Sequence, residues 1–319
     1  MLNLAERILQ GDEKSGARLI SLIEARDRRG YAELTQLLPY IGRAHILGVT
    51  GPAGAGKSTL ISQVASRLSK QEKKLGIVAI DPTSLHSGGA LLGDRLRMKE
   101  AENTGDIFIR SMADRDQPGG VCHAALGAVY VMEALGKDMV IVESVGAGQS
   151  DKALFYLCDT VVTVFTPELG DELQLLKAGL LEIGDMVVLN KCDKPGAEDA
   201  VACLCAHVRM KAEREWSPPV VPTEAHVGAG IDECVSVIER RWDFLQKDKR
   251  ASESRRRKIT MFVMTLLKEE LWRRFAGIYD NDKEYKHIMG EAESNIIDPY
   301  TAIELIADSA EARLRSAIT

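Results

Sequence analysis

The residues best suited to chemistry form a short glycine-rich segment between an apolar run and a helical pattern. The segment fits G-x-x-x-x-G-K-[ST] and consists of Gly51, Pro52, Ala53, Gly54, Ala55, Gly56, Lys57 and Ser58, followed by Thr59. Glycines let the backbone wrap closely around a phosphate, and the N–H groups of a helix N-terminus attract anions. We expect Lys57 to reach the β- and γ-phosphates of a nucleotide and Ser58 to bind Mg²⁺ through its hydroxyl.

A second motif predicts which base the nucleotide carries. The pattern N-K-x-D follows an apolar run, at Asn190, Lys191, Cys192 and Asp193. A carboxylate at position 193 can accept the N1–H and the 2-amino group of guanine, whereas adenine would leave that buried charge unpaired. A later loop is placed to contact the guanine oxygen through a backbone N–H, and it consists of Glu224, Ala225 and His226. The sequence therefore predicts binding of GTP and GDP.

Acidic residues near the ends of two predicted strands are candidate Mg²⁺ ligands. Glu143 ends an apolar run and is followed by a glycine at position 146, which would let the backbone approach the γ-phosphate. Asp81 ends another run, and Asp94 lies on the loop after it. Gln149 could orient the attacking water, or it could be a plain surface residue. Hydrolysis of GTP needs little more than a positioned water, Mg²⁺ and compensation of developing charge.

The motifs lie where short apolar runs alternate with helical patterns. The runs expected to form strands are 45–50, 75–80, 106–110, 139–143, 160–166, 186–190 and 219–223. Helical patterns between several of them cover 57–69, 121–135, 171–182 and 198–213. Most runs are apolar on both faces, which is typical of parallel strands covered by helices on each side. We expect an α/β P-loop NTPase fold with a mainly parallel sheet, in which 106–110 could be an edge strand.

Both ends of the chain have helical patterns. Residues 2–40 predict two or three short helices interrupted at Gly11 and Gly30, and after residue 232 only helices are indicated, the last one opening at Asp298 and Pro299. We expect a helical extension at 1–43, a GTPase domain at 44–245 and a helical arm at 246–319. Their apolar stripes favour dimerisation, unless they pack entirely on their own domain. The basic stretch 250–274 is either a solvated helix face or a docking surface for an acidic partner.

Composition narrows the classes of partner. The 319 residues include 41 Lys and Arg against 47 Asp and Glu, a formal charge of −6, and only 5% are aromatic. These values disfavour a nucleic-acid-binding protein. The sequence has no apolar run of 18 residues and no basic, apolar N-terminal leader, so we expect no membrane insertion and a cytoplasmic location.

Three further segments resemble the MeaB/ArgK-type GTPases, the methylmalonyl-CoA mutase-associated G proteins. One is D-P-T-S at 81–84 with S-G-G-A-L-L-G-D-R-L-R-M at 87–98, and the others are E-S-V-G-A-G-Q-S at 143–150 and G-D-E-L-Q-L-L-K-A-G at 170–179. With the two nucleotide motifs, the resemblance covers residues 46 to 230. The chain departs from the family pattern at 110–120, at Leu85 and His86, and at Glu224 to His226 in place of S-A-L.

The resemblance implies a GTPase domain of the dimerisation-prone P-loop class with helical extensions. It implies a homodimer that chaperones an adenosylcobalamin-dependent acyl-CoA mutase, gating cofactor loading and protecting or rescuing the enzyme. GTP hydrolysis would be slow alone and faster with the partner. Asp81, Asp94 and Glu143 would surround Mg²⁺ and the γ-phosphate, and Lys177 would be a switch lysine. The supplementary cation for hydrolysis could be Lys177, Arg95 or Arg110.

Three other functions stay open on the sequence. A nickel-enzyme metallochaperone would share the fold, although histidine-rich and C-x-x-C tracts are lacking. A P-loop kinase would need an acceptor site, which no segment resembles. An assembly scaffold would hold its nucleotide without hydrolysing it.

Overall fold

The computed structural model describes residues 2–82, 106–114, 124–144, 156–167, 180–209, 215–247, 250–279 and 282–318. Its internal contacts divide the chain into two compact units, Met1–Phe262 and Val263–Thr319. The dividing point lies inside a helix. The division at residues 43 and 245 expected from the sequence remains a prediction.

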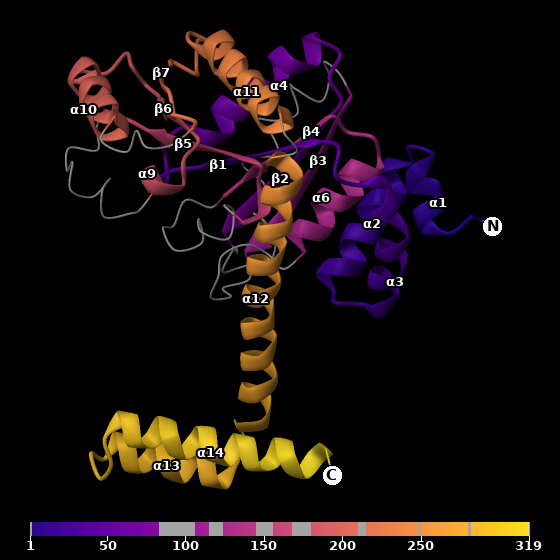
Figure 1. Cartoon of the computed structure of the whole chain (residues 1–319), viewed down its shortest axis with the longest axis vertical. Coiled ribbons are helices and arrows are strands. Elements are labelled where there is room, and N and C mark those ends of the chain that lie inside the picture. Colours follow the sequence, from indigo (N-terminus) through magenta and orange to yellow (C-terminus); the bar gives the residue numbers. More distant parts are fainter. Residues whose placement is uncertain are drawn as a thin grey trace. The chain divides into compact units, whose positions relative to one another are not determined.

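The first unit is built on a seven-stranded sheet in which all described pairings are parallel, in the order β3-β2-β4-β1-β5-β6-β7 (Figure 1). The strands are β1 (His45–Thr50), β2 (Leu75–Pro82), β3 (Ile107–Asp114), β4 (Met139–Glu143), β5 (Thr160–Phe165), β6 (Met186–Leu189) and β7 (Val220–Pro222). The predicted fold class is confirmed. All residues of β1, β4, β5 and β6 are buried, as their two-faced apolar runs predict.

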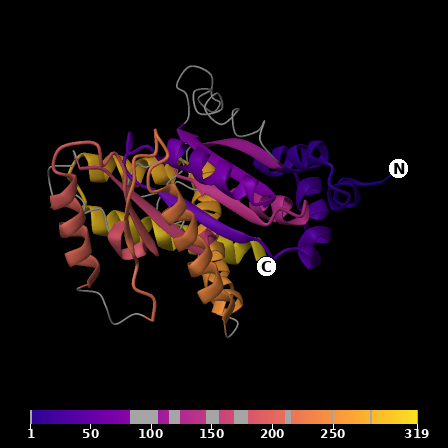
Figure 2. The ribbon, with the colours of Figure 1, turned by 90° about the horizontal axis from the view of Figure 1, so that it is seen from above.

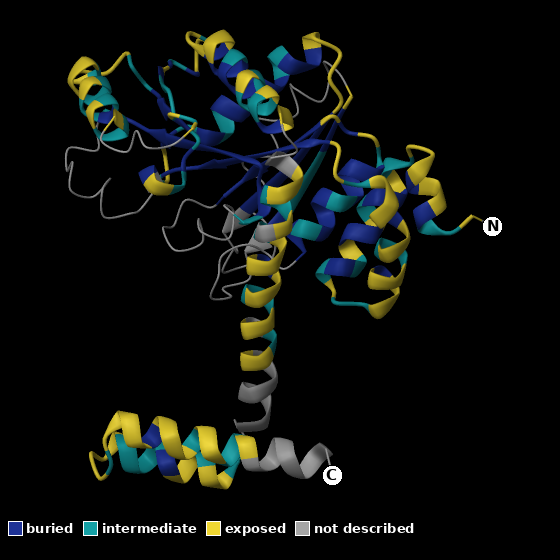
Figure 3. Cartoon of the chain, viewed as in Figure 1, coloured by how far each residue is buried: buried dark blue, intermediate teal, exposed yellow. Residues whose placement is uncertain are grey.

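Helices cover both faces of this sheet (Figures 2 and 3). On one face, α4 (Lys57–Lys70) and α11 (Ile231–Gln246) contribute to a core that includes Leu47, Ile77 and Val188. Alternate strand residues such as Val187 and Leu189 face the opposite layer. That layer contains α6 (Ala125–Ala134), α9 (Leu180–Ile183) and α10 (Ala197–Arg209). Strand and helix alternation therefore positions the carboxyl ends of the strands together, where open α/β sheets bind ligands.

The N-terminal helices are α1 (Leu4–Leu9), α2 (Glu13–Glu24) and α3 (Arg28–Leu37), followed by the 3₁₀ turn η1 (Leu38–Tyr40). Gly11 separates the first two, as expected, but the predicted break at Gly30 is wrong. The chain turns instead at Arg26, whose φ is 55°, and the Asp27 side chain caps α3. Gly30 lies inside α3, where an added Cβ would come within 2.9 Å of the Leu22 Cβ, so close packing explains this glycine.

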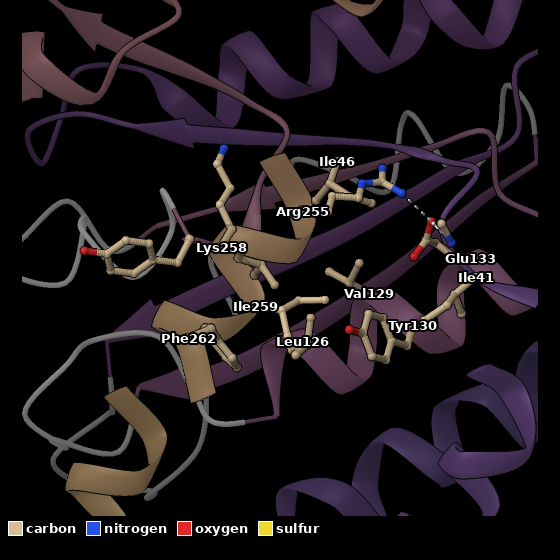
Figure 4. Close-up of a pocket in the computed structure, with 13 residues that line it drawn as sticks. Ile41, Ile46, Leu126, Val129, Tyr130, Glu133, Arg255, Lys258, Ile259 and Phe262 are labelled. Atoms are coloured by element: carbon tan, nitrogen blue, oxygen red, sulfur yellow. Dashed lines mark hydrogen bonds and ion pairs between the residues drawn. The ribbon is translucent and has the colours of Figure 1, made fainter. Parts of the chain in front are cut away.

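The first turns of α12 (Arg250–Tyr279) belong to the first unit and carry basic residues that point inward. Arg255 pairs with the buried carboxylate of Asp159. It also lies near Glu133, as Figure 4 shows. Lys258 donates to the carbonyl oxygen of Cys158 at 2.6 Å. Burial lowers the pKa of Lys258 and raises that of Glu133. Arg255 and Lys258 therefore serve internal packing, and neither alternative predicted for the basic stretch describes them.

An apolar cavity of about 100 Å³ lies beside these basic residues (Figure 4). Its lining includes Ile46 of β1, Leu126 and Val129 of α6, and Ile259 and Phe262 of α12. Small-molecule sites occupy roughly 300–1,000 Å³. This cavity is too small for a nucleotide and marks where α12 packs on the sheet.

The second unit contains the rest of α12, α13 (Lys283–Glu293) and α14 (Pro299–Ile318). Asp298 accepts hydrogen bonds from the backbone of Tyr300 and Thr301, at 2.9 and 3.1 Å, so the predicted cap of the last helix is confirmed. Large apolar side chains of this unit are exposed, including Leu267, Leu271 and Trp272. None of the described helices combines the length and apolar character needed to cross a bilayer.

Candidate nucleotide-binding site

The glycine-rich loop joins the carboxyl end of β1 to the first turn of α4, and two of its glycines are required by geometry. Gly51 has φ 149°, and an added Cβ would lie 2.2 Å from the carbonyl oxygen of Val164. Gly56 has φ 89°, and an added Cβ would lie 2.3 Å from the Asn190 Nδ2. Larger residues would distort the loop at both positions. Since the loop leads into the N-terminus of α4, its N–H groups can surround an anion.

Lys57 lies at the start of α4 and folds back over this loop. Its Nζ donates to the carbonyl oxygens of Gly51 and Pro52 at 2.9 and 3.2 Å, and the residue is buried. The ammonium group is therefore held directly above the loop that would carry the phosphates. A bound triphosphate would offer it charged acceptors stronger than neutral carbonyls.

Ser58, in the first turn of α4, contacts Glu143, the last residue of β4. The Ser58 hydroxyl donates to the Glu143 Oε1 at 2.7 Å, and Glu143 is buried at the end of β4. In the parallel pairing of β4 with β1, Glu143 lies opposite Val49, one residue before the end of β1, so its side chain is near the loop that follows β1. A hydroxyl and a carboxylate are oxygen ligands of the type that Mg²⁺ prefers, so this donor set fits the ion.

The structure places the other predicted metal and catalytic residues less completely. Asp81 belongs to β2, two positions beyond the residue that pairs with Glu143, and its side chain lies outside the described structure. Asp94, Gln149 and Lys177 fall outside the described residues. Their roles remain predictions.

Asn190 connects the phosphate loop to the base-binding loops. Its Nδ2 donates to the carbonyl oxygen of Ala55 at 2.9 Å. Its Oδ1 accepts from the Ala225 N–H at 3.0 Å and from the Thr223 hydroxyl at 3.2 Å. Asn190 is only 3% exposed. One buried amide therefore fixes the loops after β1, β6 and β7 relative to one another. The N-K-x-D pattern predicts that Asn190 and Lys191 brace the base pocket, and the structure gives the partners of Asn190.

The residues expected to contact guanine lie together on the loops after β6 and β7. The chain turns at Lys191, whose φ is 60°, and the backbone N–H of Cys192 donates to the Thr223 carbonyl at 3.1 Å. Asp193, Glu224 and His226 then contribute two carboxylates and an imidazole, whose ligand atoms all lie within 4.8 Å of one another. Burial raises the pKa of the Cys192 thiol, so that thiol adds no negative charge at neutral pH.

Arg110 is not available as the supplementary cation that the sequence suggested. On β3 it pairs with Glu24 of α2 and donates to the Ser21 hydroxyl at 3.0 Å. This contact joins the sheet to the N-terminal helices. Arg95 lies outside the described residues.

A phosphate loop, an acid beside its serine and an N-K-x-D loop, all at the carboxyl edge of a parallel sheet, define a P-loop GTPase. The comparisons then identify the family. The family model for methylmalonyl-CoA mutase-associated GTPase MeaB matches residues 16–279, and the chain belongs to this family.

Several relatives match this chain over nearly its whole length. A Pyrococcus abyssi protein provisionally described as a GTPase is 38% identical, over 95% of this chain and 94% of its own length. GTPase ArgK of Escherichia coli is 30% identical over the same shares of the two chains. A solved structure described as LAO/AO transport system kinase has a TM-score of 0.74 and 25% identity, covering 98% of this chain and 99% of that one.

One relative carries a similar segment within a much larger protein. The fused isobutyryl-CoA mutase of Geobacillus kaustophilus is 37% identical over 205 residues, which are 61% of this chain and 19% of that protein. In that relative, the GTPase-like segment and a mutase share one polypeptide.

Proposed function

We propose that this protein is a GTP-hydrolysing chaperone of an adenosylcobalamin-dependent acyl-CoA mutase, methylmalonyl-CoA mutase or a related enzyme. It would gate loading of the cofactor and protect or reactivate the mutase. The observation that carries the GTPase assignment is the junction made by Asn190, which joins a phosphate loop to a guanine-type pocket. The mutase assignment is supported by membership of the MeaB family and by the fused mutase among the relatives.

The phosphate side of the site would work through positioning and charge. Residues 51–59 would surround the phosphates with backbone N–H groups, and the Lys57 ammonium would leave the loop carbonyls for the β- and γ-oxygens. Ser58 and Glu143, with Asp81 and Asp94, would hold Mg²⁺. When bound, Mg²⁺ supplies positive charge that stabilises the negative charge developing on the phosphates.

Hydrolysis would be slow in the isolated protein and faster with the mutase. Gln149 would orient the attacking water, and Lys177 would approach the nucleotide when the partner binds. A well-placed cation is worth roughly 10³–10⁵ in rate in GTPases of this type. Because Arg110 is engaged with Glu24, Lys177 and Arg95 are the remaining candidates of the three cations named from the sequence.

The second unit would mediate a homodimer in the cytoplasm. Leu267, Leu271 and Trp272 are between 46% and 62% exposed on α12. Exposed apolar side chains gathered on one helical element are typical of a protein–protein interface. A second copy of this arm would bury them.

The test measures phosphate release from GTP by the full-length protein, alone and with purified methylmalonyl-CoA mutase or isobutyryl-CoA mutase. We expect one mutase to raise the rate at least tenfold and to be retained by protein loaded with a GTP analogue. Ser58→Ala should abolish the magnesium-dependent rate, whereas Ser236→Ala on α11 should leave it unchanged. Equal rates with and without either mutase would overturn the chaperone assignment.

The same reaction decides between the GTPase and a kinase, a second candidate because the solved relative is described as a transport system kinase. A GTPase releases inorganic phosphate, whereas a kinase transfers the γ-phosphate to an acceptor. Phosphorus NMR of the products distinguishes the two. A phosphorylated product other than inorganic phosphate would favour the kinase.

A further inference from the structure

The carboxyl ends of β1 and β4 carry two hydroxyl groups that are buried against each other. Thr50 is the last residue of β1, and Ser144 directly follows the last residue of β4. The Ser144 hydroxyl donates to the Thr50 Oγ1 at 2.9 Å, and the two residues are 2% and 0% exposed. Burying two hydroxyls costs free energy that their hydrogen bonds roughly offset, so an apolar pair of the same shape would stabilise this part of the core equally well. Stability alone therefore does not explain the pair.

The hydroxyl pair joins the two strands at the point where each leads into the candidate site. Thr50 directly precedes Gly51, the first residue of the phosphate loop, and Ser144 directly follows Glu143. Glu143 lies opposite Val49 in the parallel pairing, and the Ser144 N–H donates to the Val49 carbonyl at 3.0 Å. Ser144 is therefore bound to β1 through both its backbone and its side chain, one residue beyond Glu143.

The end of β4 thus contacts residues on both sides of the phosphate loop. Ser144 contacts Thr50, which lies before the loop. Glu143 contacts Ser58, which lies after the loop, through the 2.7 Å hydrogen bond to its Oε1. Mg²⁺ requires near-ideal octahedral geometry, so its affinity depends on groups that hold its ligands in place. Without the hydroxyl pair, the backbone at Glu143 could shift relative to Ser58 and displace the carboxylate.

We infer that Thr50 and Ser144 are positioning residues, which affect metal binding through Glu143. The inference rests on the proposed GTP-binding function and on the fit of Ser58 and Glu143 to Mg²⁺. The hydroxyl pair holds the Glu143 carboxylate beside the Ser58 hydroxyl, so that both oxygens can bind one ion. It contributes to the affinity for the metal and not to the affinity for the nucleotide itself.

The experiment measures metal binding directly. Mn²⁺, a paramagnetic substitute for Mg²⁺, is titrated into the full-length protein loaded with a non-hydrolysable GTP analogue, with protein in excess, and electron paramagnetic resonance reports the free ion. Thr50→Val and Ser144→Ala each remove one hydroxyl, whereas Thr50→Ser keeps it. Thr160→Val is the matched control, because the Thr160 hydroxyl is as deeply buried but contacts the His45 Nε2 at 2.8 Å, at the amino end of β5. Urea unfolding and calorimetry with GDP in EDTA are measured in parallel for every variant.

Thr50→Val and Ser144→Ala should each weaken Mn²⁺ binding by about three- to tenfold, the range expected for one hydrogen bond. Thr50→Ser and Thr160→Val should bind Mn²⁺ as the parental protein does, and the affinity for GDP in EDTA should be unchanged in all four variants. The double variant of Thr50→Val and Ser144→Ala should regain most of the urea stability that the single variants lose, because neither hydroxyl is left without its partner. Its Mn²⁺ affinity should stay as low as theirs.

Mn²⁺ affinity that merely follows the urea stability, with recovery in the double variant, would overturn the inference and leave the pair a structural role. Unchanged Mn²⁺ affinity in both single variants would overturn it too, as would a parental complex that binds no Mn²⁺. If Thr50→Val does not fold, Ser144→Ala against the parental protein still decides the question. A parental protein that binds ATP as tightly as GTP would instead refute the proposed function itself, so the two failures are distinguished by whether the nucleotide or the metal reveals them.

Discussion

Replacing Asn190 by alanine is expected to damage stability and nucleotide binding together. The amide makes three hydrogen bonds, with Ala55, Thr223 and Ala225, all in residues that are at most 2% exposed. Alanine would leave the Ala55 carbonyl and the Ala225 N–H without this partner in a buried environment. Each unsatisfied buried group costs about 1–3 kcal/mol, so we expect the free energy of unfolding to fall by about 2–5 kcal/mol.

A second variant separates the two halves of this junction. Asn190→Asp keeps oxygens that can accept from Thr223 and Ala225, but it places a carboxylate oxygen against the Ala55 carbonyl, where the parental protein has a donor. We expect it to loosen the phosphate loop while preserving the contact between the loops after β6 and β7. Thr223→Val removes the hydroxyl contacts to the Asn190 Oδ1 at 3.2 Å and to the Leu189 carbonyl at 3.4 Å, and should cost about 1 kcal/mol.

Urea unfolding gives the stability, and calorimetry with GTP and Mg²⁺ gives the affinity. We expect Asn190→Ala to bind GTP at least tenfold more weakly than the parental protein and Thr223→Val to lie between the two. An Asn190→Ala protein with a free energy of unfolding within 0.5 kcal/mol of the parental value, and with unchanged GTP affinity, would refute the role given to this amide.

Two further predictions concern residues at the amino ends of β1 and β5, opposite the ends that carry the phosphate loop. Arg255→Met should lower the free energy of unfolding by about 3–5 kcal/mol, because it leaves the buried Asp159 carboxylate unpaired, whereas Arg256→Met at an exposed position should change it little. Urea unfolding of the two variants checks this, and equal losses would contradict it. Burial lowers the pKa of His45 to about 4, so between that pH and its unfolded pKa of about 6.5 the unfolded state binds a proton that the folded state does not. The contribution of His45 to the free energy of unfolding is therefore complete above pH 6.5 and is lost as the pH falls to about 4. His45→Phe keeps a ring beside Trp242. Between pH 7 and pH 4, its free energy of unfolding should fall by about 3 kcal/mol less than that of the parental protein. If the free energies of unfolding of the two proteins changed in parallel with pH, His45 would not titrate in this way.

The elements that position the phosphate loop were predictable from the sequence because their environment is uniform. β1 and β4 match the expected runs residue for residue, since strands covered on both faces need apolar residues throughout. α4 starts at the predicted Lys57 because a glycine loop and a helical pattern meet there. The edge strand β3 was less regular, and it runs to Asp114 instead of ending at residue 110.

Features that depend on distant residues were not predictable. The basic pattern of α12 gave no indication that Arg255 pairs with Asp159, because that partner lies 96 positions earlier in the chain. The sequence pattern predicts a helix break at Gly30, whereas the small size of this residue serves packing against Leu22. The pattern also offers Arg110 as a catalytic cation, whereas in the structure Arg110 pairs with Glu24. In each case a local pattern fixed the residue type but left its partner open.

One departure from the family pattern, at Glu224 to His226, lies in the loop expected to contact the base. Ser58 and Glu143 form the contact expected of a magnesium site, and the loop glycines have the required geometry. Glu224 and His226, by contrast, add charge and a donor beside Asp193. Because Asn190 ties both sides together, changes in how the base is held can reach the phosphate loop through a single buried amide. Variation at 224 and 226 can therefore adjust nucleotide affinity while the groups proposed to act on the γ-phosphate stay the same.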